Sequence, residues 1–247
     1  MASISYQLFS SRNHPLEETL AMLAGIGLKE VEGFGAQFED PAATKALLDQ
    51  HGMTMPTGHF AFDLVEGDPA KALSIAETLG VKAVVVPFLM PDRRPSDRHG
   101  WAEFAERLAE AGKPILDAGL QFGWHNHDFE FTQTADGCLP IEMIADASDD
   151  IGLELDLAWI TRAGKDPVDW INRYAGRIIA AHVKDLARPG ECADEGGWAD
   201  LGHGIMDWGR IIPALRAAEV SRWVLEHDNP ADHQRFATRS FETVSTF

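Results

Sequence analysis

The sequence predicts an α/β protein, and the architecture it favours is a (β/α)8 barrel of the TIM type, formed as a single domain by residues 1–247. Short runs rich in apolar and β-branched residues alternate with longer helical patterns along the chain. Eight such β-then-α units in this length match the count and size of that barrel. Alternation itself requires parallel strands joined by crossover helices. A doubly wound sheet is the competing architecture, but it usually needs fewer units.

Each expected strand is a short apolar run, and several of these runs end at a charged or imidazole side chain. No linker, low-complexity tract or block of like charge divides the chain, so a single domain is expected. The expected strands cover residues 4–8, 28–33, 54–58, 82–87, 120–125, 151–156, 178–183 and 222–226.

The segments between the strands carry the start and stop signals of helices. Asp40 and Asp68 each precede a proline, which is favoured at the first helical position after a capping side chain. The longest helix opens on Ser96. Glycine follows several helices, as at Gly80 and Gly119, where it permits a left-handed helix end. The expected helices cover residues 16–24, 42–50, 69–79, 96–118, 142–147, 167–174, 207–218 and 232–244.

The longest expected loop covers residues 187–206, directly after the seventh strand. It is rich in glycine and acidic residues, and it contains Trp198. A loop of this length inside a compact domain is usually a lid or a binding loop.

The charge of the chain excludes some classes of partner. Lys and Arg number 21 against 39 Asp and Glu, a net charge of −18. This disfavours nucleic acid and anionic membrane surfaces, both of which select basic proteins. The N-terminal residues lack a signal-peptide pattern, and no stretch approaches the roughly 20 apolar residues of a membrane span. We therefore expect a cytoplasmic protein that acts on a small molecule, with a homo-oligomer left open.

Polar side chains gather at the ends of the last four expected strands. Gly123 to Phe131 places two His, one Asp, one Glu and one Asn within nine residues. Alternate residues of a strand share a face, so His125 and His127 point the same way. Asp156, the pair His182 and Lys184, and the pair Glu226 and Asp228 close the inward rows of the three following strands.

In a (β/α)8 barrel these strand ends meet at one place, the C-terminal face where active sites lie. Four neighbouring strands then bring an imidazole, a carboxylate, an imidazole and a carboxylate together, from His125, Asp156, His182 and Glu226. Mixed nitrogen and oxygen ligands of this kind suit Mn²⁺, Zn²⁺, Co²⁺ or Mg²⁺. Glu154 lies one layer deeper than Asp156, and we expect a structural role for it.

The runs WHNHDFEF, GLELDLAWI, AHVKDL, LGHGIMDW and VLEHDNP resemble the sugar phosphate isomerase/epimerase family. This family belongs to the xylose-isomerase-like TIM barrel superfamily, which also contains ketose 3-epimerases, inosose isomerases and dehydratases, hydroxypyruvate isomerase and endonuclease IV. The resemblance covers nearly the whole chain and is strongest from residue 120 to residue 230. Its motifs identify the superfamily, but they carry little information about the substrate.

The resemblance implies one divalent metal ion, Mn²⁺ first among the candidates, held by Glu, Asp, His and Glu from the fifth to the eighth strand. Asp156, His182 and Glu226 match the last three of these ligands. This chain departs at the first, where His125 stands in place of Glu. Glu130, folding back from the loop, and His127 are the alternatives, and His127 is preferred as a substrate ligand.

The departure at His125 affects the expected mechanism. Epimerases of the family use two metal-bound Glu residues as acid and base on opposite faces of a planar ene-diolate. Glu226 matches one of them, and Lys184, His127 and Glu130 are the candidates for the other. Lys184 would bind a substrate oxygen, act as a base if desolvation lowers its pKa, or form an ion pair with Asp185 or another carboxylate.

Further residues are expected around the substrate. Glu32 at the end of the second strand and His59 at the end of the third resemble family positions near the substrate. Glu130, Trp159 and Asp228 complete this group. Some relatives carry a His where this chain has Trp159, and endonuclease IV needs one there for its metal cluster. Trp159 therefore argues, together with the charge, against a DNA-repair enzyme.

The function expected from these residues is a metal-dependent isomerase or epimerase of a sugar, sugar phosphate, keto-sugar or cyclitol. It would work by removing a proton next to a metal-polarised carbonyl. The alternative is a lyase on the same scaffold, either an inosose- or dehydroshikimate-type dehydratase or an enzyme of β-elimination from a 3-keto-glycoside. Both start with the same proton abstraction, and the missing first Glu keeps the alternative open.

Overall fold

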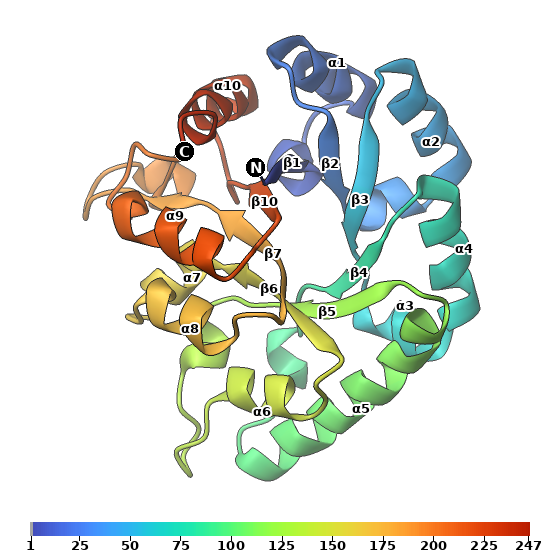
Figure 1. Cartoon of the computed structure of the whole chain (residues 1–247), viewed down its shortest axis with the longest axis vertical. Coiled ribbons are helices and arrows are strands. Elements are labelled where there is room, and N and C mark those ends of the chain that lie inside the picture. Colours follow the sequence, from blue (N-terminus) through green and yellow to red (C-terminus); the bar gives the residue numbers. More distant parts are fainter. Residues whose placement is uncertain (1) are drawn as a thin grey trace.

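The computed structural model describes residues 2–247 and confirms the predicted fold class. Eight parallel strands close into a barrel in the order β1-β10-β7-β6-β5-β4-β3-β2. Helices surround this barrel, and the last helix, α10, lies beside the first, α1 (Figure 1). The barrel strands are β1 Ser3–Gln7, β2 Glu30–Gly33, β3 Thr54–His59, β4 Ala83–Val86, β5 Gln121–His125, β6 Ile151–Asp156, β7 Ile178–Val183 and β10 Arg222–Leu225.

The sixth and seventh strands begin and end where the sequence predicts, and the others differ by one or two residues at an end. The longest helix begins later than predicted, at Arg98, because the side chain of Asp97 and not Ser96 accepts the hydrogen bond that caps it, from the Gly100 N–H at 2.9 Å. The helices are α1 Leu16–Ile26, α2 Pro41–Gln50, α3 Phe62–Gly67, α4 Pro69–Leu79, α5 Arg98–Asp117, α6 Pro140–Asp146, α7 Leu157–Arg162, α8 Pro167–Arg173, α9 Trp208–Ala217 and α10 His233–Val244.

Two of these helices, α3 and α7, were not predicted. Helix α7 follows β6 with no intervening loop, so the run GLELDLAWI resembles one long strand in sequence. The Asp156 carboxylate marks the boundary, because its Oδ1 accepts hydrogen bonds from the N–H groups of Ala158 and Trp159 at 3.0 and 2.9 Å. A capping residue that also ends a strand gives no separate signal in the sequence.

The predicted loop after the seventh strand is tied down along most of its length, which is unlike a mobile lid. Strand β9 (Trp198–Ala199), inside the loop, pairs antiparallel with β8 (Asp185–Leu186), which directly precedes the loop. The buried Asp185 carboxylate accepts hydrogen bonds from the N–H groups of Gly202 and Met206 and from the Trp208 indole, at 2.8 to 3.0 Å. A single carboxylate thus holds the end of the segment and the first residue of α9.

A β-bulge on β7 turns an isoleucine side chain into the barrel interior, below the polar residues at the C-terminal strand ends. Pairing between β6 and β7 runs Leu153 to Ile178 and then Glu154 to Ala180, which leaves Ile179 as the extra residue. Its side chain lies against Gly123 and Gly152, where a Cβ atom would come within 2.7 and 2.5 Å of it. These two glycines therefore make room for the Ile179 side chain below the polar layer.

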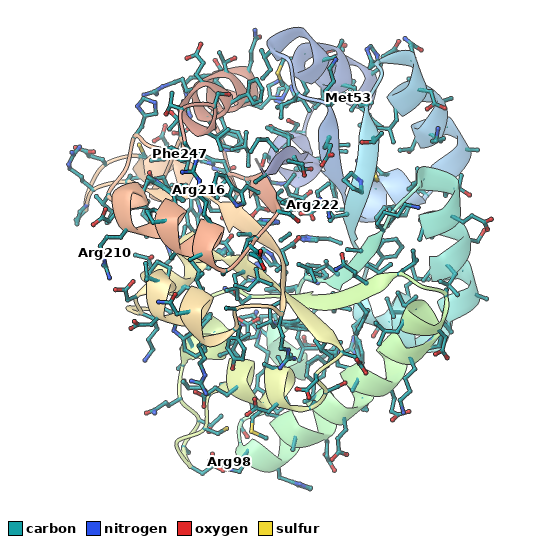
Figure 2. All side chains as sticks on the ribbon, in the orientation of Figure 1. Met53, Arg98, Arg210, Arg216, Arg222 and Phe247 are labelled. Carbon is teal, nitrogen blue, oxygen red and sulfur yellow. The ribbon has the colours of Figure 1, made fainter. Side chains whose placement is uncertain are left out.

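The outer surface carries most of the charge. Figure 2 labels Arg98 and Arg210 at the outer ring of helices, where their partners are Asp136 and Asp166. Within residues 2–247, no helix combines the length and the apolar character that crossing a membrane would require.

Candidate active site

The C-terminal ends of the barrel strands carry a dense buried layer of ionisable side chains. Strand alternation turns every second residue inward, and at this level the inward residues are imidazoles and carboxylates instead of aliphatic groups. The register places His125 opposite Glu154 and Asp156 opposite His182. The members of this layer are Glu32 on β2, His59 on β3, His125 on β5, Glu154 and Asp156 on β6, His182 on β7, Lys184 after β7 and Glu226 after β10, all at most 9 % exposed.

The structure brings together the four residues that the sequence predicts as metal ligands. One ligand atom from each of His125, Asp156, His182 and Glu226 lies within 4.8 Å of the others. Nδ1 of His182 lies 2.9 Å from Glu226 Oε2 and 3.9 Å from Asp156 Oδ2. We call these four residues the upper group. Two imidazoles and two carboxylates form a donor set that fits a divalent ion such as Mn²⁺ or Zn²⁺.

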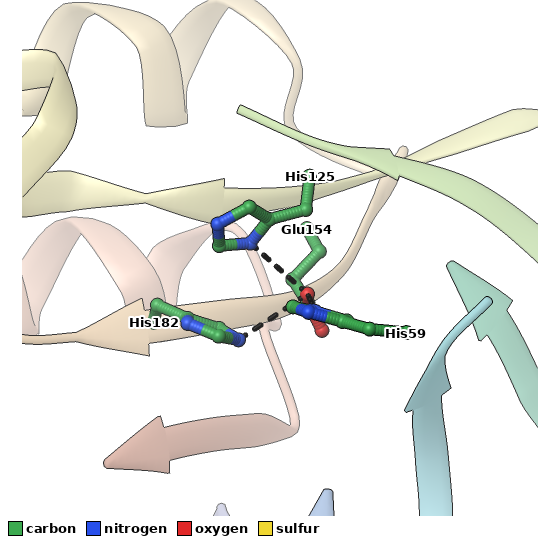
Figure 3. A group of neighbouring side chains, drawn as sticks. All are labelled: His59, His125, Glu154 and His182. Carbon is green, nitrogen blue, oxygen red and sulfur yellow. Dashed lines mark hydrogen bonds and ion pairs between the residues drawn. The ribbon is translucent and has the colours of Figure 1, made fainter. Parts of the chain in front are cut away.

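Glu154 takes part in more contacts than its expected structural role requires. Its Oε2 lies 2.5 Å from His59 Nε2, 3.1 Å from His125 Nδ1 and 3.2 Å from His182 Nε2. Figure 3 shows the three imidazoles around this one carboxylate. Ligand atoms of His59, His125, Glu154 and His182 also lie within 4.8 Å of one another, and we call these residues the lower group. The signal in the sequence was the spacing of Glu154 two residues before Asp156, which puts both on the inward face.

Lys184 forms ion pairs with three carboxylates, and the expectation that it serves as a base is wrong for this arrangement. Its Nζ lies 2.7 Å from Glu226, 2.9 Å from Asp228 and 3.0 Å from Asp156. Burial alone would lower the pKa of Lys184, but the three carboxylates outweigh burial and raise the pKa above its usual value. Lys184 is therefore a fixed cation. Its expected partner Asp185 instead holds the loop described above.

The imidazoles of the layer differ in charge because their neighbours differ. Burial and the nearby His182 lower the pKa of His125 to about 4, so His125 is neutral at pH 7. Burial also disfavours a charged His182, but Glu154 and Glu226 outweigh it and raise the pKa of His182 well above its usual value. Neutral and charged imidazoles thus stand side by side before any ion binds.

Glu130 does not reach the metal-ligand candidates, which corrects two of its expected roles. Its carboxylate accepts hydrogen bonds from the Trp124 indole at 3.0 Å and from the His127 N–H at 2.9 Å, and it is 0 % exposed. A single 3-10 turn, Phe129–Phe131, carries Glu130 back to the Trp124 side chain, and Glu130 does not line the cavity. Glu130 is thereby removed from both the metal group and the substrate, and it fixes the backbone that presents His127.

His127 points into a cavity of about 510 Å³ above the ionisable layer. Its Nδ1 has no hydrogen-bond partner, and its ring packs 5.0 Å from Phe88 and 5.2 Å from Trp159. Burial, and secondarily the neighbouring His125, lower the pKa of His127 well below its usual value. A neutral imidazole therefore lines the cavity, and its buried Nδ1 has no hydrogen-bond partner.

Of the residues expected around the substrate, His59 and Asp228 line this cavity together with His125, His127 and Glu226. Glu32 does not line it. It lies beneath, where its Oε1 accepts a hydrogen bond from Gln7 Nε2 at 2.8 Å and lies 2.8 Å from His182 Nε2.

Trp159 stands behind His127 and packs on Trp198, with ring centroids 4.7 Å apart. It is therefore a supporting residue in this structure, and it is not part of the cavity lining.

The walls of the cavity are apolar, and the sequence analysis missed them. Phe9, Phe34, Phe62, Phe88 and Met90 come from segments that follow the first four strands. Loop residues lack the periodicity that identifies strand positions, so no pattern marked them. Arg93 at the edge is paired with Asp63 at 2.7 Å.

Comparisons with known proteins agree with the fold. A profile of the xylose isomerase-like TIM barrel family matches residues 20–240. An inosose dehydratase of Lacticaseibacillus casei is 22% identical over 242 residues, which cover 85% of this chain and 80% of that protein.

Two solved structures extend this comparison. A sugar phosphate isomerase/epimerase from Parabacteroides distasonis superposes with a TM-score of 0.82 at 20% identity, covering 98% of this chain and 93% of that one. The IolI protein with a bound zinc atom superposes with a TM-score of 0.78 at 16% identity, covering 100% and 97%. At these identities the superpositions show a shared fold.

Proposed function

This chain belongs to the xylose isomerase-like TIM barrel family, and we propose that it is a metal-dependent isomerase or epimerase of a sugar, keto-sugar or cyclitol. The observation that carries the proposal is the placement of Glu226 and His127 at one cavity floor. They follow β10 and β5, which stand three positions apart around the eight-strand barrel. Two groups that exchange protons thus approach a bound ligand from different sides.

The upper group would hold the ion through His125, Asp156, His182 and Glu226. When bound, a divalent ion supplies a Lewis acid that polarises a carbonyl and lowers the cost of the negative charge developing on its oxygen. Mn²⁺ is our first candidate. Zn²⁺, Co²⁺ and Mg²⁺ are the alternatives, because each of them binds to at least one of the two ligand types, imidazole and carboxylate. Lys184 fixes the two carboxylates of the group by its contacts at 3.0 and 2.7 Å.

We assign the proton transfers to Glu226 and His127. In this proposal the Glu226 carboxylate takes the proton from the carbon next to the substrate carbonyl, and the electron pair moves to form an ene-diolate. The N–H of the neutral His127 imidazole returns a proton to the opposite face of the same carbon, which inverts that centre. Solvent then reprotonates His127 and takes the proton from Glu226 when the product leaves. Return of the proton to the neighbouring carbon, together with transfer of the hydroxyl proton between the two oxygens, moves the carbonyl instead. The aromatic walls keep water away from the ene-diolate during this exchange.

The charges around the cavity favour an unphosphorylated substrate. A phosphate would face the Glu226 and Asp228 carboxylates on the floor. Arg93 at the edge binds Asp63, and Lys184 contacts three carboxylates. Arg12 and Arg94 lie against the rings of Phe9 and Phe88 on the outer side of the cavity wall, and the carboxylates of the floor are the charges that a ligand meets. Apolar walls beside a polar floor suit the alternating C–H and hydroxyl faces of a sugar or cyclitol ring.

Proton exchange in heavy water tests this proposal directly. The Mn²⁺-loaded protein would be incubated in D₂O with a panel of ketoses, 3-keto-glucosides and inososes, and deuterium at the carbon next to the carbonyl read by NMR. We expect exchange with at least one compound. Glu226→Gln should reduce it by about 10²- to 10⁴-fold, the usual worth of an acid–base group. Glu110→Gln on the exposed face of α5 is the control, and metal content is measured for each variant. Absence of exchange with every compound would contradict the proposal.

A second candidate, a lyase, has a specific observation in its favour. His125 stands on β5 in place of the Glu that the two-carboxylate mechanism uses, so the two carboxylates at the cavity floor, Glu226 and Asp228, both follow β10. A relative matching 85% of this chain is named inosose dehydratase. In this version Glu226 removes the same proton, a C=C bond forms, and the adjacent hydroxyl leaves as water or a glycosidic oxygen leaves as an alcohol.

Product mass separates the two candidates in the same experiment. Isomerisation and epimerisation leave the mass of the substrate unchanged in ordinary water, whereas dehydration removes one water and β-elimination releases an alcohol. Mass spectrometry of the reaction mixture would therefore assign the class once a substrate is turned over.

A further inference from the structure

The lower group is a second cluster of metal-ligating atoms that the proposed reaction does not use. Glu154 Oε2 lies within 3.2 Å of a nitrogen from each of His59, His125 and His182. All four side chains are at most 9 % exposed, and they come from four different strands (Figure 3). Three imidazoles and one carboxylate are a common donor set for an imidazole-preferring divalent ion.

His182 presents a different nitrogen to each group. Its Nδ1 faces Glu226 in the upper group at 2.9 Å, and its Nε2 faces Glu154 in the lower group at 3.2 Å. A neutral imidazole offers one free lone pair, because its other nitrogen carries a proton. His182 can therefore ligate in only one group at a time, and the two groups compete for it.

The surroundings of the lower group favour a cation. Glu154 Oε1 has no hydrogen-bond partner although Glu154 is 0 % exposed, and Glu32 Oε2, beside the same imidazoles, has none either. An unpaired buried carboxylate oxygen is costly unless a cation or a donor satisfies it. Five carboxylates of the layer and its edge are opposed by Lys184 and the charged His182, which leaves a formal charge of −3; they are Glu32, Glu154, Asp156, Glu226 and Asp228.

We propose that His59, His125, Glu154 and His182 form an alternative metal position beneath the upper group, selective for Zn²⁺ or Co²⁺ over Mn²⁺ or Mg²⁺. The ligand types set this preference, because imidazole favours the former ions while carboxylate oxygen favours the latter. His59 and His125 line the cavity, so an ion reaches the position from the same side as the substrate. Occupation of one position withdraws His125 and His182 from the other. The proposal concerns metal binding and does not require the reaction proposed above.

Binding of the metals alone tests the proposal by a double comparison. Zn²⁺ and Mn²⁺ affinities of the metal-free full-length protein would be measured by calorimetry, with Mn²⁺ also followed by its electron paramagnetic resonance signal. We expect Glu154→Gln to weaken Zn²⁺ binding by at least about tenfold more than Mn²⁺ binding, because Glu154 is itself a ligand in the lower group and only contacts the ligands His125 and His182 of the upper group. Asp156→Asn should do the reverse. The visible absorption of Co²⁺ gives an independent reading of the ligand set.

Two controls keep this test decisive. His59→Gln removes a second member of the lower group alone, so it should reproduce the effect of Glu154→Gln even if the latter folds poorly. Thermal unfolding of each variant establishes that it is folded. Parallel losses of Zn²⁺ and Mn²⁺ affinity in all variants, or Zn²⁺ affinity unchanged in both Glu154→Gln and His59→Gln, would overturn the proposal. A protein that shows this pattern but exchanges no substrate proton would contradict the proposed function and support the metal position.

Discussion

The ammonium of Lys184 lies 2.7 Å from the carboxylate of Glu226, with both side chains buried in the barrel. Two more carboxylates, those of Asp156 and Asp228, contact the same ammonium. The lysine thus supplies the positive charge that lets carboxylates converge at the strand ends. A site that gathers metal ligands must tolerate their mutual repulsion when no ion is bound, and Lys184 reduces that repulsion.

Lys184→Met is therefore expected to destabilise the fold by about 3–5 kcal/mol, because it leaves two buried carboxylates, Asp156 and Glu226, and the partly exposed Asp228 without their cation. Denaturant unfolding of the metal-free protein measures the loss. Lys45→Met is the matched control. Its partner Asp49 and Lys45 itself are 62% and 40% exposed, so the expected change is below about 1 kcal/mol. Equal, small effects of both substitutions would show that Lys184 does not balance the carboxylates.

Gly123→Ala should destabilise the barrel by about 1–3 kcal/mol, the usual range for overpacking. A Cβ atom there would lie 2.7 Å from the backbone oxygen of Gly152 and 2.7 Å from Ile179. Gly25→Ala provides the comparison, because nothing lies within 4 Å of that position in helix α1. Alanine there should stabilise by about 0.5–1 kcal/mol through helix propensity. Thermal or urea unfolding shows whether each substitution lowers or raises the free energy of unfolding.

Glu130 makes the stability depend on pH. Burial raises its pKa from 4.5 to about 8, although N–H groups of its own backbone and of His127 lower it in part. Between these two values the unfolded chain has lost the proton while the folded protein keeps it. Stability from this group therefore falls as pH rises from about 5 to 8, by up to about 1.4 kcal/mol per pH unit.

Glu130→Gln removes this titration, so its urea midpoints at pH 5, 6, 7 and 8 should decline less with pH than those of the unaltered protein. The comparison rests on the slope and not on absolute stability, since Gln also alters the hydrogen bonds with Trp124 and His127. Indistinguishable slopes would mean that Glu130 is ionised throughout this range.

Phosphorylated ligands should bind poorly. With Mn²⁺ present, a neutral inosose is expected to raise the thermal midpoint, and an inositol phosphate should leave it nearly unchanged because it meets Glu226 and Asp228. Asp63→Asn frees Arg93 at the cavity edge and should restore part of the phosphate effect. A larger shift with the phosphate than with the neutral compound in the unaltered protein would contradict this reading of the cavity.

The barrel strands were predictable because their signals are local. Ile151–Asp156 and Ile178–Val183 are largely apolar runs that carry a polar inward residue at or one position before their end, and both have the predicted bounds. Helix α7 was not predictable in the same way. Its capping residue, Asp156, is also the last residue of a strand, so the boundary between the two elements leaves no break in the hydrophobic pattern.

Two candidate site residues show why side-chain roles were harder to predict. The sequence placed Glu130 and Glu154 at the right level of the barrel, but the first turns back beneath Trp124 and the second meets three imidazoles. Which partner a buried carboxylate finds depends on strands far away in the chain. His59 lies 95 residues from Glu154 and contacts it at 2.5 Å.

By itself the sequence determined the eight-unit barrel and the convergence of His125, Asp156, His182 and Glu226, because strand period and the parallel order of the units fix which residues turn inward. Only the tertiary structure decided that Lys184 is held as a cation and that Glu154 forms a second group of ligands. Burial and distances of a few ångströms set charge and pairing, and those quantities exist only after the chain has folded.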